Sequence, residues 1–182
     1  MSPFSFFNVF SANPPILIFS PARRAKDNTT KHTYENLKEV KEVVINIVNF
    51  PMVEQMSLSS TEYGKGENEF VKSGFTPIAS DKITPPRVAE APISFECIVD
   101  DIIELGAEGG AGNLIISRVV NIHIRDEYKG NDGKLDTEKL DLVARMGGNW
   151  YTRTGKDSIF EIQKPIYSKG IGVDALPIHA RN

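Results

Sequence analysis

Two long runs of β-forming residues on either side of a glycine-rich segment constrain the fold of this chain most strongly. Residues 93–105 alternate in part, with Phe95, Cys97 and Val99 on one side, and residues 114–125 form the longest predicted strand. The short segment between the two runs contains four glycines, which is typical of a hairpin connection. The sequence therefore predicts a long antiparallel hairpin and a mainly β fold.

Shorter predicted elements surround this hairpin. Further strands are expected at residues 16–20, 43–48 and 159–162. Helical segments are expected from Thr33, at 51–59, at 67–73 with Gly74 as the end, and at 140–146. Strands interrupted by short helices predict a Greek-key antiparallel barrel with short helical insertions. A length of 182 residues suits one domain.

Charge and cysteine content exclude several classes of protein. The net charge of −3 argues against a general nucleic-acid binder, which is usually basic. The single cysteine cannot form an internal disulfide, which fits a reducing compartment. No apolar run is long enough to span a bilayer, and the apolar residues 1–10 lack the basic start of a signal peptide. We therefore expect a cytoplasmic protein that binds neither nucleic acid nor membranes.

Residues that bind metals or act as nucleophiles show no recognisable arrangement. Metal-ligand spacing is absent among Cys97 and the three histidines, His32, His123 and His179. The sequence leaves open a nucleophilic pair of Cys97 with a histidine, although a buried packing cysteine is far more common in a strand. Neither a metal site nor a catalytic residue is predicted.

The first fifty residues carry the most specific pattern. Pro3-Phe-Ser-Phe-Phe-Asn8 and Ser11-Ala-Asn-Pro-Pro15 precede an apolar strand and a basic loop at residues 21–31. Thr33 then has the character of a helix N-cap. Basic side chains and the start of a helix together suit a phosphate group, whereas small polar residues stiffened by prolines suit the polar edges of a planar ring.

In this order the motifs resemble the flavin reductase-like family of FMN-binding split-barrel proteins, which includes flavoredoxin-type members. The strand at 119–125 and the segment Arg145-Met-Gly-Gly-Asn-Trp-Tyr151 resemble the family as well, so the likeness covers most of the chain. The resemblance implies an FMN-binding split β-barrel. It also implies a homodimer with flavin at or near the subunit interface, and a possible redox partner protein.

The resemblance places FMN mainly against main-chain groups of the N-terminal segment. The implied contacts to the ring are Ser5, Phe6, Phe7, Asn8, Ser11, Ala12, Asn13 and Pro14. The implied contacts at the phosphate end are Arg23, Arg24, Lys26, Lys31 and Thr33, and Ser20 is a further implied cofactor contact. Without the resemblance, the basic residues would be interpreted as a solvated loop, and the phenylalanines suit core or subunit contacts better than stacking on flavin.

Three later residues complete the implied site. His123 lies on a strand where related reductases have a histidine that contacts flavin or nicotinamide, and it is equally compatible with a structural role. Arg145 and Tyr151 match the family motif Arg-x-Gly-Gly-x-x-Tyr, where they either line the cofactor cleft or fix a turn. The two interpretations stay open for each residue.

The chain departs from the family pattern at both ends. The family usually has a strand pair before the Pro-Phe-Ser segment. Within the motif, His32 stands at a position where the family often has Asp. We therefore expect residues 1–182 to form a single domain that lacks the N-terminal hairpin, either because the chain starts at an internal methionine or because a partner covers the gap. Residues 170–177 resemble the start of a segment that longer relatives continue.

For function, the resemblance implies an NAD(P)H-dependent flavin reductase, in which hydride passes from nicotinamide C4 to flavin N5. The cofactor performs this chemistry and the protein positions the reactants, so an acid–base pair is not needed. Two alternatives remain open at this point. One is an FMN-binding electron carrier without NAD(P)H activity, and the other is an inactive, truncated remnant.

Overall fold

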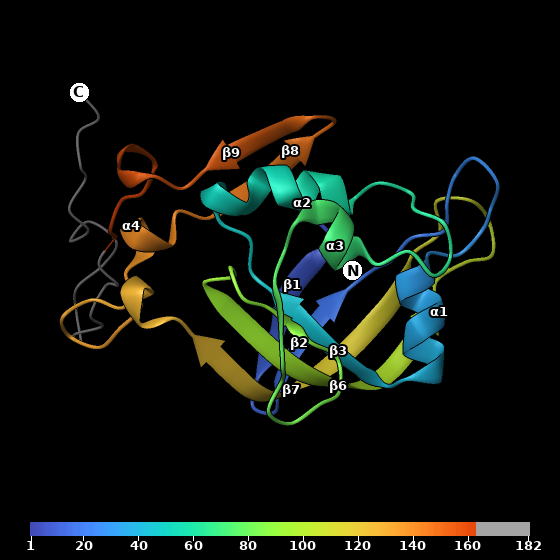
Figure 1. The fold of residues 1–182 in the computed structure, drawn as a ribbon, viewed down its shortest axis with the longest axis horizontal. Coiled ribbons are helices and arrows are strands. Elements are labelled where there is room, and N and C mark those ends of the chain that lie inside the picture. Colours follow the sequence, from blue (N-terminus) through green and yellow to red (C-terminus); the bar gives the residue numbers. More distant parts are fainter. Residues whose placement is uncertain (163–182) are drawn as a thin grey trace, which may run out of the picture.

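A five-stranded antiparallel sheet forms the centre of the molecule in the computed structural model, which describes residues 1–162 (Figure 1). The strands follow the order β1 (Phe7–Ala12), β2 (Pro15–Phe19), β7 (Asn113–Ile124), β6 (Ile93–Glu104) and β3 (Glu42–Asn46). The mainly β class is therefore confirmed, as are the strands expected at 16–20 and 43–48.

The predicted long hairpin is confirmed as β6 and β7, which pair from Ile93↔Ile124 to Glu104↔Asn113. The register of this ladder shifts between Glu96 and Cys97, as at a β-bulge. Neighbouring residues of a regular strand point to opposite faces, but here Glu96 and Cys97 are both fully buried. The irregularity thus brings a carboxylate into the interior beside the apolar face.

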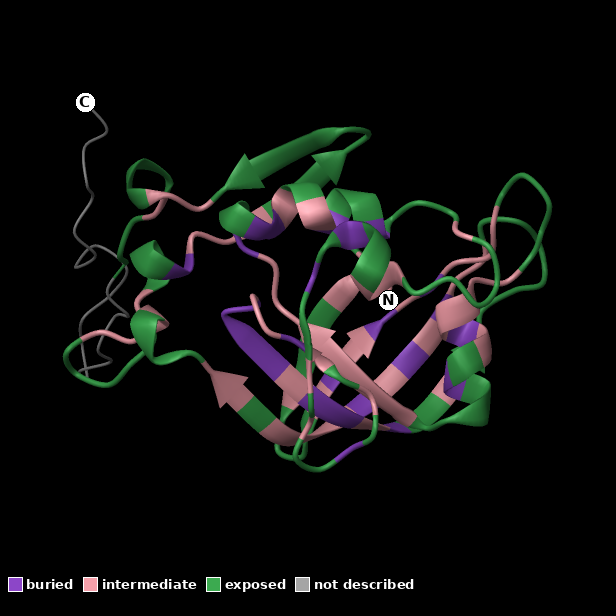
Figure 2. Ribbon diagram, viewed as in Figure 1, coloured by how far each residue is buried: buried purple, intermediate pink, exposed green. Residues whose placement is uncertain are grey.

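Helix α1 (His32–Glu39) packs one end of the sheet, because its Tyr34 and Leu37 join a buried cluster with Phe19, Val99 and Ile115. A second cluster lies under the 3₁₀ helix η1 (Phe50–Met52), α2 (Val53–Ser59) and α3 (Glu69–Ser73). Gly74 ends α3 in the left-handed conformation at φ 75°, as predicted. Figure 2 shows the buried residues concentrated along β6 and the inner side of these helices.

The remaining elements are small. A two-stranded ribbon is formed by β4 (Pro77–Ile78) and β5 (Arg87–Val88). After β7 follow η2 (Asp126–Tyr128), α4 (Thr137–Leu140), β8 (Val143–Gly147), β9 (Trp150–Arg153) and η3 (Lys156–Ser158). The hairpin of β8 and β9 lies beside α2 and is exposed along nearly its whole length (Figures 1 and 2). Among the described helices, none has the length and apolar character needed to cross a membrane.

Three predictions are wrong. Helix α1 begins at His32 with Lys31 in the N-cap position, so Thr33 is the second helical residue and not the cap. The helix expected at 140–146 ends at Leu140, because Asp141 adopts a left-handed φ of 46° and the chain continues as β8. Residues 159–162 form no strand. The predicted continuation at 170–177 and His179 lie outside the described residues.

Candidate functional site

The basic loop between β2 and α1 is held against the loop that joins β6 to β7. The Arg23 N–H donates to Ala111 O at 2.8 Å, and the Gly110 N–H donates to Arg23 O at 3.1 Å. At Gly109, a Cβ would lie 3.0 Å from Ala25 O, so the close approach of the two backbones depends on glycine at this position. The long hairpin therefore sets the position of the basic loop.

A small cavity of about 80 Å³ opens where this loop meets α1 and the end of α2. Its wall includes Arg24 and Lys31, residues His32 and Thr33 at the start of α1, and residues 59–63. Within residues 1–162, the backbone N–H groups of His32 and Thr33 make no hydrogen bond. The first N–H groups of a helix lack partners inside the helix, so the side chains of Arg24 and Lys31 and two N–H donors can meet an anion in this cavity, whose wall also carries the carboxylates of Glu62 and Glu69.

The four predicted basic residues have different surroundings. Arg23 braces its own loop, since its Nε and Nη2 donate to the side chain and carbonyl of Asn28. Arg24 reaches the cavity and donates to Thr29, Thr30 and Glu62, whereas the exposed Lys26 pairs only with Glu62 among the described residues. Lys31 lies 5.5 Å from the ring centre of Phe4, and no carboxylate in the described part of the chain is within ion-pair distance of it. The structure thus brings Arg24, Lys31 and Thr33 together at the cavity.

The segment predicted to meet the flavin ring runs away from this cavity along β1. The Ser20 N–H donates to Phe6 O at 3.0 Å, so the start of β1 adjoins the basic loop, while the Ala12↔Pro15 pair lies at the other end of the strand. Within the described residues β1 pairs only with β2, which leaves one row of its backbone groups available. Two of the implied ring contacts, Phe7 and Ser11, are partly buried, and Phe7 packs against the core. The other implied ring contacts are exposed: Ser5, Phe6, Asn8, Ala12, Asn13 and Pro14.

Ser20, which directly follows β2, has a different setting from the implied phosphate contacts. Its Oγ is buried and has no hydrogen-bond partner among the described residues. A Cβ at Gly112 would lie 2.7 Å from this oxygen, so the hydroxyl packs directly against the loop after β6. The structure therefore places Ser20 between the two loops, outside the residues that line the cavity.

Arg145 and Tyr151 are cross-strand partners in the hairpin of β8 and β9. Arg145 Nη2 donates to Gly148 O at 2.8 Å in the turn of the same hairpin, which matches the interpretation that this motif fixes a turn. Neither residue lines the cavity beside the basic loop.

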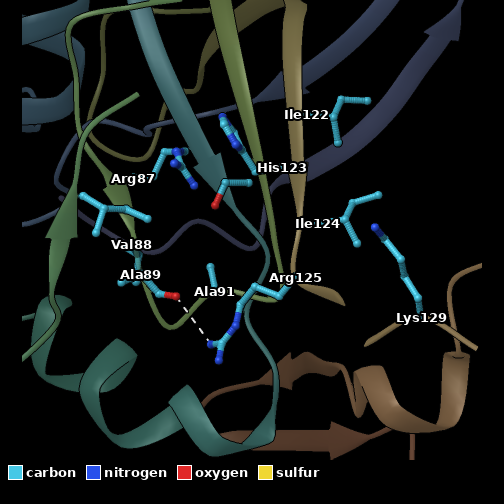
Figure 3. A pocket seen from close by; sticks show the side chains of 11 residues that line it. Arg87, Val88, Ala89, Ala91, Ile122, His123, Ile124, Arg125 and Lys129 are labelled. Carbon is cyan, nitrogen blue, oxygen red and sulfur yellow. Dashed lines mark hydrogen bonds between the residues drawn. The ribbon is translucent and has the colours of Figure 1, made fainter. Parts of the chain in front are cut away.

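His123 lies near the far end of β7, ten residues from Asn113, whose side chain donates to Pro21 O at the start of the basic loop. It lines a larger cavity of about 440 Å³ together with Arg87, Arg125 and apolar residues of β5 and β7 (Figure 3). Its Nε2 is 2.5 Å from Glu96 Oε1. His123 therefore belongs to a separate polar cluster and not to the cavity beside the basic loop.

Glu96 is the centre of that cluster, and sequence reasoning missed it. Burial alone would raise the pKa of Glu96, but hydrogen bonds from the Asp81 N–H, from His123 and from the Lys82 N–H stabilise the carboxylate and lower its pKa from 4.5 to about 2. Oxygens of Asp81 and Glu96 lie within 4.8 Å of a His123 nitrogen, as in some metal sites. Because these hydrogen bonds already engage both Glu96 oxygens, we interpret the cluster as structural.

Sequence reasoning also missed residues 59–63, which form one wall of the smaller cavity. They lie at and just after the end of α2, a helix that the sequence indicated only through the proline shortly before its start. No spacing in the sequence relates them to residues 24–33. Only the tertiary structure, which places the end of α2 and the segment after it against the basic loop, brings the hydroxyls of this segment and the carboxylate of Glu62 to the site.

The curved antiparallel sheet, with a basic loop and a helix start at one end, defines a split-barrel protein of the flavin reductase type. The family model described as "Flavin reductase like domain" matches residues 2–141, and the chain belongs to this family.

Similar proteins support the assignment. The uncharacterized protein BH2278 of Halalkalibacterium halodurans is 36% identical over 92% of this chain and 79% of its own. Nitrilotriacetate monooxygenase component B from Bacillus cereus is 32% identical, covers 88% of this chain and 78% of its own, and superposes with a TM-score of 0.80. A putative flavin reductase with split barrel domain from Shewanella frigidimarina is 25% identical, with coverages of 92% and 78% and a TM-score of 0.73.

Proposed function

We propose that this protein binds FMN, with the phosphate in the cavity between the basic loop, the start of α1 and residues 59–63. The observation that carries the proposal is the convergence on one small cavity of Arg24, Lys31 and the N–H groups of His32 and Thr33, which have no partner within residues 1–162. The donor set fits a phosphate monoester, which takes both cations and backbone N–H groups. The family membership makes a flavin the phosphate carrier to test first.

The ring of the flavin would lie along β1, where main-chain donors and acceptors are available at the sheet edge. We expect a second subunit to cover this region, because an edge strand that exposes Val9 and Phe10 at 61% and 72%, next to Phe6 at 68%, is unfavourable in water. A homodimer would thus exclude water from the ring and hold it in place, which is the contribution a flavin site requires from the protein.

For the reaction, we propose reduction of bound flavin by NAD(P)H. Bound FMN supplies the hydride acceptor, while Arg24, Lys31 and the start of α1 hold its phosphate and β1 orients the ring edge. The names of the similar proteins, a monooxygenase component and a putative flavin reductase, support a redox role. The same site also suits an electron carrier that is reduced by a protein partner.

The binding proposal is tested with a double variant, Arg24→Ala with Lys31→Ala, in titrations of FMN and of riboflavin, which lacks the phosphate. We expect the wild-type protein to be yellow with FMN, and the variant to lose at least 10-fold in FMN affinity with little change for riboflavin. Lys65→Ala is the matched control, because Lys65 is exposed and lies outside the cavity wall. Equal losses for both ligands would contradict phosphate binding at this cavity.

The reaction is tested by anaerobic stopped-flow mixing of the FMN-loaded protein with NADH or NADPH. Bleaching of the flavin band faster than free FMN supports a reductase. If neither nucleotide bleaches bound FMN above the free-flavin rate, the electron carrier becomes the better hypothesis. A colourless protein that gains no thermal stability from millimolar FMN would contradict both, since ligand at 100 times its Kd adds about 2.7 kcal/mol.

A further inference from the structure

Glu62 pairs with Arg24, one of the two cations on which the proposed phosphate site depends. It follows α2 and lines the small cavity, 38 residues from Arg24 in the chain. Its Oε1 accepts from Arg24 Nε at 3.1 Å, and its Oε2 pairs with Lys26 Nζ. The hydrogen bond from Lys26 holds the pKa of Glu62 below its usual value. Both carboxylate oxygens are therefore engaged by the basic loop.

A phosphate that enters this cavity competes with the Glu62 carboxylate for the guanidinium of Arg24. Arg24 also donates to Thr29 and Thr30 within its own loop, so its guanidinium is anchored independently of Glu62. The side chain of Glu62 is 53% exposed, and it lies between α2 and α3 in a segment without regular structure. Of the two partners, Glu62 is thus the one free to swing into solvent while Arg24 stays in place.

Resting on the proposed function, we infer that Glu62 is a resident counter-ion, which pairs with the site cation Arg24 in the ligand-free protein and is displaced from it by the phosphate of the incoming ligand. A carboxylate carries one negative charge and a phosphate monoester close to two, so the phosphate is attracted more strongly to Arg24 than the Glu62 carboxylate is. Glu62 would then lower the affinity for phosphate-bearing flavins and leave riboflavin unaffected. It acts as a specificity-determining residue and not as a catalytic one.

The inference is tested by measuring the Kd of FMN and of riboflavin for Glu62→Gln, at fixed moderate ionic strength. We expect FMN to bind about 3- to 10-fold more tightly to the variant, because a competing charge of ordinary ion-pair strength is removed. Riboflavin should change by less than about twofold. Inorganic phosphate should also bind the variant more tightly, which is measured by competition at an FMN concentration well below the Kd of FMN.

Glu108→Gln is the matched control, since it removes the same charge from the neighbouring β6–β7 loop. Glu108 is exposed and, among the described residues, forms no salt bridge. An equal gain in FMN affinity from Glu108→Gln would mean that net charge alone acts, and would overturn the inference.

Two further results separate this inference from the proposed function. If wild-type protein prefers FMN to riboflavin but Glu62→Gln binds FMN equally or less well, Glu62 organises the cations and the counter-ion inference is wrong while the function stands. If neither protein binds FMN better than riboflavin, the phosphate site itself is wrong and the inference falls with it.

Discussion

Replacing the buried Glu96 with Gln should remove a large, pH-dependent part of the stability of the fold. The Glu96 carboxylate is fully buried and accepts backbone hydrogen bonds at 2.8 Å from Asp81 and 2.7 Å from Lys82, with His123 at 2.5 Å. These partners lower its pKa from 4.5 to about 2. At about 1.4 kcal/mol per pKa unit, this shift corresponds to about 3 kcal/mol of stability at neutral pH.

The pKa shift also gives the direction of the pH dependence. Because the pKa of Glu96 is lower in the folded state, the unfolded chain takes up the proton first as the pH falls. The stabilisation is therefore complete above about pH 5 and is lost progressively toward pH 2, with about 1 kcal/mol lost by pH 3.5. Glu96→Gln has no carboxylate at this position, so its stability should not show this contribution.

Urea unfolding followed by far-UV circular dichroism, from pH 7 to pH 3.5, measures both effects. We expect Glu96→Gln to lose about 3 kcal/mol at pH 7 and to differ less from wild type at each lower pH. Asp100→Asn is the control on the same strand, because its pair with Arg118 is partly exposed and should contribute under about 1 kcal/mol. Parallel curves for wild type and Glu96→Gln across this range would refute the reasoning.

Three further predictions follow from packing around the sheet. Ile115→Ala should lower the free energy of unfolding by about 2–5 kcal/mol in urea titrations, because Ile115 is fully buried in the cluster under α1; a loss under 1 kcal/mol would contradict this packing. Gly109→Ala should weaken FMN more than riboflavin in binding titrations, because its Cβ would press on the backbone of Arg24 and Ala25, and equal effects on both ligands would count against it. Burial raises the pKa of the Cys97 thiol to about 12, so Ellman's reagent at pH 8 should react with it only after unfolding.

The sequence by itself determined the elements whose signals are local. The β6–β7 hairpin was predictable because strand periodicity and a glycine-rich connection lie next to each other in the chain. The basic loop and the approximate start of α1 were predictable for the same reason, and they carry the family motif. The helix expected at 140–146 failed because composition alone did not reveal the left-handed turn at Asp141, after which the chain pairs as β8 and β9.

Only the tertiary structure decided which charges face one another. Arg24 and Glu62 meet because the segment after α2 lies against the basic loop, and no periodicity relates residues so far apart. Glu96 turns inward because the β6 ladder shifts register at that residue, which an alternating pattern cannot indicate. Secondary structure depends largely on residues that are close in the sequence, whereas the tertiary contacts of a side chain depend on the whole path of the chain. For this reason the family motif was recognisable from the sequence, and the counter-ion within the proposed phosphate site was not.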